Sequence, residues 1–244
     1  MPAPLKRVLI VILSVLIAPA GVFLYHETIL KALTGNHHGI VAFILAVIRF
    51  FEVGSLLLVF SSVLLAGAVF GLAYGLMAGI LGIYDLSGPA GWIELVIDLT
   101  WSLPNTLFGF VVGNLVYPFF GSPSREQSED QGWIVYAPGG GSGFGHDVLQ
   151  TLGTVNLGGT GAHEKVHLFQ ARLFGPAYLI LFGANYVLNS IVQLLWTGTV
   201  GLVLYLTNLR DTPYFRPTAH SAVQGFFGWI YQSTVFELWA YATE

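Results

Sequence analysis

The chain contains no cysteine and very little charge. Without cysteine it forms no disulfide and offers no thiolate as a nucleophile or a metal ligand, so a metal site must use His, Asp or Glu. Only 9% of its 244 residues are charged and 55% are hydrophobic. Soluble domains carry about 25% charged residues. Too few charges are present to cover a water-facing surface, so lipid must cover much of it. The composition predicts a polytopic membrane protein.

Several common functional signatures are also missing. The formal net charge is −4 and the few Lys and Arg residues form no run, which argues against a nucleic-acid partner. The glycine-rich stretch 139–145 is not followed by Lys-Ser or Lys-Thr, as a phosphate-binding loop requires. Ser142 stands in Gly-Ser-Gly-Phe-Gly rather than Gly-x-Ser-x-Gly, which argues against a serine hydrolase.

The apolar runs predict an all-α membrane protein with four to six membrane helices, placed in residues 1–120 and 161–244. Lys6 and Arg7 precede the first run, Val8 to Leu24. Because basic residues favour the cytoplasmic side, we expect a signal anchor or first span with its amino end in the cytoplasm.

A second apolar stretch, Ile40 to Tyr84, is too long for one span. As a single helix it would measure about 65 Å, against a hydrocarbon core of about 30 Å. It must bend or divide, and we expect the break near Glu52-Val53-Gly54-Ser55. Its second half repeats glycine every fourth residue, which predicts a smooth strip for close helix packing. The strip consists of Gly67, Gly71, Gly75 and Gly79.

Residues 121–160 differ from the rest and predict an extramembrane segment. They hold the only charged run of the chain, 124–130, followed by a glycine-rich turn region. The partial alternation of Val148 to Leu157 predicts a short strand or hairpin directly before the next helix.

The chemistry is concentrated in His163-Glu164-Lys165-Val166-His167, a His-Glu-x-x-His motif. In a helix the two histidines lie four residues apart on one face, so their imidazoles can bind one zinc ion while Glu164 acts on a zinc-bound water. In such a site the preceding strand, 148–157, could pair with an extended peptide substrate. The simpler alternative is that both histidines form hydrogen bonds with neighbours near the membrane surface.

A catalytic zinc ion normally has three protein ligands. Glu237 is the preferred third ligand, because it lies on the last apolar helix, 221–241, where an unpaired carboxylate would be costly. His220, His146 and Asp147 are the other candidates.

The motif resembles that of membrane-bound zinc peptidases of the gluzincin type, the class of the CAAX prenyl proteases and the membrane heat-shock proteases. There a Glu-x-x-Ala-Asp-like helix supplies the third ligand. Here Glu237-Leu238-Trp239-Ala240 matches Glu-x-x-Ala, and Tyr241 stands in place of the Asp. The run from His163 to Tyr178 also resembles small uncharacterised bacterial membrane proteins with a similar Gln-x-Arg-x-Leu-Gly-Pro-x-Tyr continuation, in which Gly replaces Val166. The resemblance implies zinc ligands at His163, His167 and Glu237, with Glu164 as general base.

We therefore expect a multi-pass protein of the bacterial inner membrane that hydrolyses a peptide or membrane-protein substrate with zinc. The alternative is a catalytically inactive, metallopeptidase-like accessory subunit of a larger membrane complex, which would use its glycine strip and aromatic surface for packing. A transporter is a third possibility, because Asn185, Asn189 and Gln193 lie at i, i+4 and i+8 in an apolar run and form a polar seam.

Overall fold

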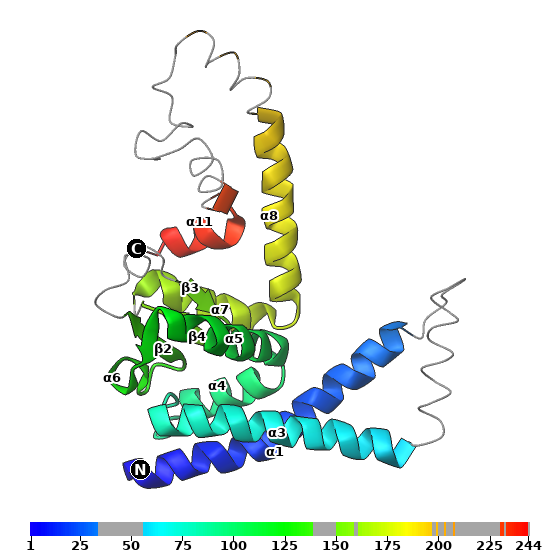
Figure 1. Cartoon of the computed structure of the whole chain (residues 1–244), viewed down its shortest axis with the longest axis vertical. Helices are drawn as coiled ribbons and strands as arrows, with labels where there is room; N and C mark the ends of the chain where they lie inside the picture. Colours follow the sequence, from blue (N-terminus) through cyan, green and yellow to red (C-terminus); the bar gives the residue numbers. More distant parts are fainter. Residues whose placement is uncertain are drawn as a thin grey trace. The chain divides into compact units, whose positions relative to one another are not determined.

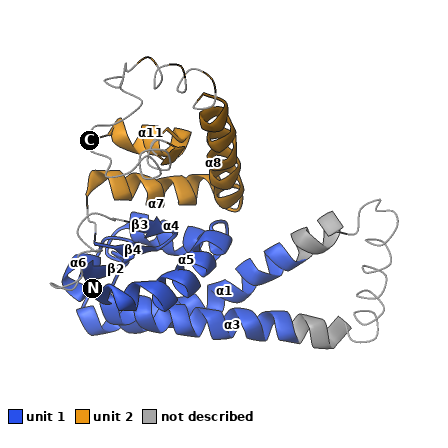
Figure 2. Cartoon of the chain, turned by 45° about the horizontal axis from the view of Figure 1, so that its top comes forward, with its two compact units in different colours: residues 1–160 blue, residues 161–244 orange. Residues whose placement is uncertain are grey.

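The structure is a computed structural model and is mostly helical (Figure 1). It describes residues 1–33, 56–138, 150–158, 161–196, 230–231 and 233–243, together with the single positions 199, 203 and 207. The expected break near Glu52 lies outside these residues. The chain divides into two compact units, 1–160 and 161–244, which Figure 2 colours separately.

Unit 1 begins with two long apolar helices, α1 (Ala3–Leu33) and α3 (Leu56–Leu81). The glycine strip of α3 faces α1, as the sequence predicts. A Cβ added at Gly67 would lie 2.5 Å from the Cα of Pro19, and one at Gly79 would lie 2.8 Å from the carbonyl oxygen of Arg7. Later positions on α3 therefore meet earlier positions on α1, so the two helices run antiparallel.

Two shorter helices follow, α4 (Pro89–Leu99) and α5 (Leu103–Val116), and a 3-10 turn, η1 (Tyr117–Phe119), extends α5. Both helices carry proline in their first turn, where its missing N–H costs nothing. Asp98 of α4 is fully buried and accepts a hydrogen bond of 2.8 Å from the hydroxyl of Tyr84. That bond provides a partner for a carboxylate that the fold has removed from water.

The segment between α5 and α7 forms a small four-stranded sheet in the order β1-β2-β4-β3. Its strands are β1 (Gly121–Pro123), β2 (Ile134–Pro138), β3 (Gln150–Leu152) and β4 (Val155–Leu157), and a one-turn helix, α6 (Arg125–Ser128), follows β1. The predicted hairpin is present as β3 and β4, which pair antiparallel.

Strand β4 is buried and has no free edge, because it also pairs in parallel with β2. A peptide substrate therefore cannot add to β4. Residues 155–157 of the expected substrate-binding segment 148–157 therefore cannot pair with a peptide, because β2 already occupies their second edge.

Helix α5 packs against the hairpin, and glycine makes the close approach possible. A Cβ at Gly109 would fall on the backbone of Leu152, 2.6 Å from its carbonyl carbon. The core of unit 1 thus includes residues from both the helices and the sheet, among them Tyr74, Leu95, Ile134 and Val155.

Unit 2 contains α7 (Ala162–Phe174), α8 (Ala177–Trp196) and α11 (Val235–Tyr241). Its core is aromatic: Phe236 of α11 packs edge-on against Phe174 of α7 and Tyr178 of α8, with ring centroids 5.5 and 5.3 Å apart. One aromatic side chain therefore connects all three helices.

Among the described residues, three helical segments are long and apolar enough to cross a membrane: 3–26, 62–81 and 177–196. Helices α4 and α5 make a fourth if the pair, bent by 81°, is counted as one span. The sequence predicts four to six.

Candidate metal centre

The His-Glu-x-x-His stretch is helical, as its spacing predicts, and forms the first half of α7. The helix ends at Phe174 because Gly175 takes a positive φ of 52° and Pro176 follows. The buried face of α7 carries polar residues, namely Glu164, His167 and Gln170 beside Leu168 and Ala171. Burying these groups requires partners inside the fold.

For His167 and Gln170 the partners come from α11, which is held at its amino end. The hydroxyl of Thr234 accepts a hydrogen bond of 3.4 Å from the backbone N–H of Glu237 and caps the helix. The side-chain oxygen of Asn185 on α8 accepts a second bond, of 2.9 Å, from the N–H of Val235. These bonds and the packing of Phe236 present Glu237 to α7.

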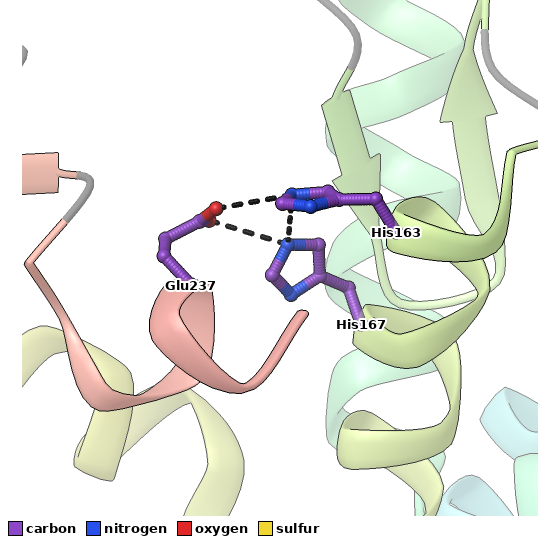
Figure 3. A group of neighbouring side chains, drawn as sticks. All are labelled: His163, His167 and Glu237. Carbon is purple, nitrogen blue, oxygen red and sulfur yellow. Dashed lines mark hydrogen bonds and ion pairs between the residues drawn. The ribbon is translucent and has the colours of Figure 1, made fainter. Parts of the chain in front are cut away.

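The side chains of His163, His167 and Glu237 meet, as Figure 3 shows. His163 Nε2 lies 3.1 Å from one Glu237 carboxylate oxygen, and His167 Nε2 lies 3.2 Å from the other. The two Nε2 atoms are 3.2 Å apart. Glu237 is 1% exposed and His167 is 5% exposed. The structure thus brings together the three residues that the sequence suggests as ligands.

Gln170 determines the tautomer of His167, that is, which of the two ring nitrogens carries the proton and which carries the lone pair. The Gln170 amide nitrogen donates to the carbonyl of Phe236 at 2.9 Å, so its oxygen is the atom that lies 3.0 Å from His167 Nδ1. An amide oxygen only accepts, so Nδ1 must carry a proton. In neutral His167 the lone pair is therefore on Nε2, directed at Glu237.

A lone pair directed at a carboxylate is repulsive unless a cation lies between them, either a proton or a metal ion. Burial disfavours the charged form of His167, but the hydrogen bond and charge of Glu237 outweigh it and raise its pKa above the ordinary 6.5. Burial likewise opposes ionisation of Glu237, and the bonds from His167 and Tyr231 hold its pKa below the ordinary value. Both shifts favour a positive charge between His167 and Glu237.

The donor set is chemically compatible with zinc. Two imidazole nitrogens and one carboxylate are a typical catalytic zinc set, and ligands about 2.0–2.1 Å from a tetrahedral ion lie about 3.3–3.4 Å apart. Here the two Nε2 atoms are 3.2 Å apart, and each lies 3.1–3.2 Å from a different Glu237 oxygen; with one atom per residue, the three ligand atoms all lie within 4.8 Å of one another. The lone pair of His167 and both carboxylate oxygens already face the same small volume.

Glu164 interacts electrostatically with His167 but is not one of the three residues that offer a ligand atom. It is 4% exposed, and its negative charge contributes to the raised pKa of both His167 and Tyr231. Such a carboxylate, near the ligands but outside their set, suits a general base.

The remaining ligand candidates, His146, Asp147 and His220, lie outside the described residues. Sequence reasoning missed two contributors, Gln170 and Tyr231, whose hydroxyl forms a hydrogen bond with Glu237. The only available signal was the i+3 spacing of Gln170 from His167, which places both on one face of α7. No sequence spacing connects Tyr231 with the motif.

Comparison with known proteins does not assign the chain to a class. No protein-family model, curated protein or solved structure matches it significantly. The functional argument therefore depends on the site itself.

Proposed function

We propose that this protein is an integral-membrane zinc metallopeptidase. His163, His167 and Glu237 would hold the zinc ion, and Glu164 would be the general base. The observation that carries the proposal is the meeting of His163, His167 and Glu237, whose ligand atoms all lie within 4.8 Å of one another, with the His167 lone pair directed at Glu237. Its position against α8, a helix apolar enough to span a membrane, supports a site at the membrane.

When bound, zinc would supply a Lewis acid that lowers the pKa of a bound water towards about 7. The chain's own residues would do the rest. Glu164 would accept the proton of the attacking water and pass it to the leaving amine. The substrate class is a peptide or a membrane-protein segment.

The first test is metal analysis of the full-length protein in detergent. We expect about one zinc ion per chain in the wild type, and none in His163→Ala. His26→Ala is the matched control, because it removes a histidine of unit 1 outside the cluster, and it should keep the metal. Equal zinc content in wild type and His163→Ala would overturn the proposal.

The second test separates the peptidase from an accessory subunit with a structural metal. Glu164→Gln should keep its zinc, yet lose hydrolysis of a quenched fluorescent casein by about 10²–10⁴-fold, the usual contribution of a general base. A wild type that binds zinc, does not cleave casein and leaves the membrane with stoichiometric partners would favour the accessory subunit.

A further inference from the structure

Gln170 forms hydrogen bonds with both helices that carry the ligands, with His167 on α7 and with Phe236 on α11. It is fully buried on α7, three residues after His167, and its amide is used at both ends. The nitrogen donates to the carbonyl of Phe236, the residue before Glu237, while the oxygen accepts from His167 Nδ1. A single side chain thereby sets the tautomer of one ligand and holds the backbone next to another.

Tyr231 acts on the third ligand. Its side chain forms a hydrogen bond with the carboxylate of Glu237, which helps to hold the pKa of that carboxyl below its ordinary value, and the residue as a whole is 37% exposed. The backbone of Glu237 is fixed separately by the cap at Thr234. Tyr231 therefore restrains the carboxylate rather than the backbone, in addition to the contacts of the carboxylate with the two histidines.

We propose that Gln170 and Tyr231 are the positioning residues of the metal centre, and that they take the place of an orienting carboxylate. Histidine ligands almost always donate their second N–H to an outer acceptor, and ligand carboxylates are themselves hydrogen-bonded. Gln170 meets the first requirement for His167 and Tyr231 meets the second for Glu237. The inference rests on the proposed zinc site and adds the residues that determine its affinity.

Zinc competition with a chromophoric chelator, on the full-length protein, tests the Tyr231 half. Loss of an outer partner typically costs 10–100-fold in metal affinity, so Tyr231→Phe should weaken zinc binding by that factor. Tyr186→Phe is the matched control: it removes one tyrosine hydroxyl from α8 in the same unit, outside the cluster, and should bind zinc like the wild type. Cobalt(II) in place of zinc should show an altered visible spectrum in Tyr231→Phe alone.

Two substitutions at Gln170 separate positioning from packing. Gln170→Met is close in volume but cannot accept from His167, and should lose 10–100-fold in zinc affinity. Gln170→Glu keeps an acceptor for His167 Nδ1 and loses the donor to Phe236, so it should keep most of the affinity. A residue that only packed would show equal losses, or none, in both variants.

The outcomes separate this inference from the function on which it rests. Wild-type zinc affinity in both Tyr231→Phe and Gln170→Met, with a wild type that binds zinc, overturns the positioning role and leaves the metal site intact. A wild type without zinc removes the proposed function and this inference together. If Gln170→Met does not fold, Tyr231→Phe still decides the Tyr231 half, and a loss of zinc affinity of about 10–100-fold in Gln170→Glu would overturn the Gln170 half.

Discussion

Replacing Glu237 by glutamine should abolish the stabilisation of the protein by zinc. The amide keeps the size of the side chain, and the cap from Thr234 involves only the backbone of residue 237, so α11 keeps its anchor. What changes is the charge and one ligand atom. The carboxylate oxygen 3.2 Å from His167 is the partner that raises the pKa of that histidine.

The expected magnitude follows from linkage. A ligand that binds only the folded state at 100 times its dissociation constant stabilises it by about 2.7 kcal/mol. For a chain of this size, 1 kcal/mol corresponds to about 2–4 °C in Tm. Zinc should therefore raise the Tm of the wild type by about 5–11 °C. At the same zinc concentration, Glu237→Gln should show a shift close to zero.

The assay is thermal unfolding in detergent, with and without zinc, of wild type, Glu237→Gln and Glu126→Gln. Glu126 lies on α6 and is exposed, so its variant makes the same chemical change away from the cluster and should keep the wild-type shift. A zinc-induced shift in Glu237→Gln equal to that of the wild type would refute the reasoning that Glu237 completes the site.

Three further predictions follow from the contacts. The pKa of His167 is raised and that of Glu237 is lowered, so the ion pair between them stabilises the metal-free protein between these two pKa values. This stabilisation is lost as the pH rises through the pKa of His167, and also as the pH falls through the pKa of Glu237. Zinc competes with the His167 proton, so its affinity should keep rising above pH 6.5, and this dependence should move to lower pH in Glu237→Gln, as a pH series of zinc titrations would show. Gly71→Ala should destabilise the protein by about 1–3 kcal/mol in chemical denaturation, because its Cβ would lie 2.8 Å from the carbonyl carbon of Ser14. Gly183→Ala is the control: a Cβ there has nothing within 4 Å, so this variant should be as stable as the wild type or more stable. Asn185→Leu should speed hydrogen exchange at the N–H of Val235, because it removes a hydrogen bond worth about 0.5–1.5 kcal/mol. Asn189→Leu, one turn further along α8, should leave this exchange unchanged. Equal exchange rates in the two variants would contradict the role of Asn185 in holding α11.

The site was only partly predictable from the sequence. His163 and His167 lie on one face because an α-helix returns to the same side after four residues, whatever surrounds it. The candidate role of Glu237 came from chemistry, the cost of a carboxylate on an apolar helix, and could not be separated from His220, His146 or Asp147 by spacing. The same limit applied to the sheet: alternation predicted the β3–β4 hairpin, but not the parallel pairing of β4 with β2 that closes its second edge.

Composition and local periodicity by themselves determined that the chain is rich in helices apolar enough for a membrane, that α3 carries a smooth glycine face and that two imidazoles lie side by side. Each of these depends on residues a few positions apart, within one helix. Only the tertiary structure decided that Glu237, 70 positions after His167, reaches both histidines. That meeting depends on the packing of Phe236 between α7 and α8 and on the bonds from Gln170 and Asn185 to α11. Contacts between residues so far apart in the chain arise from the packing of whole helices, which no local pattern specifies.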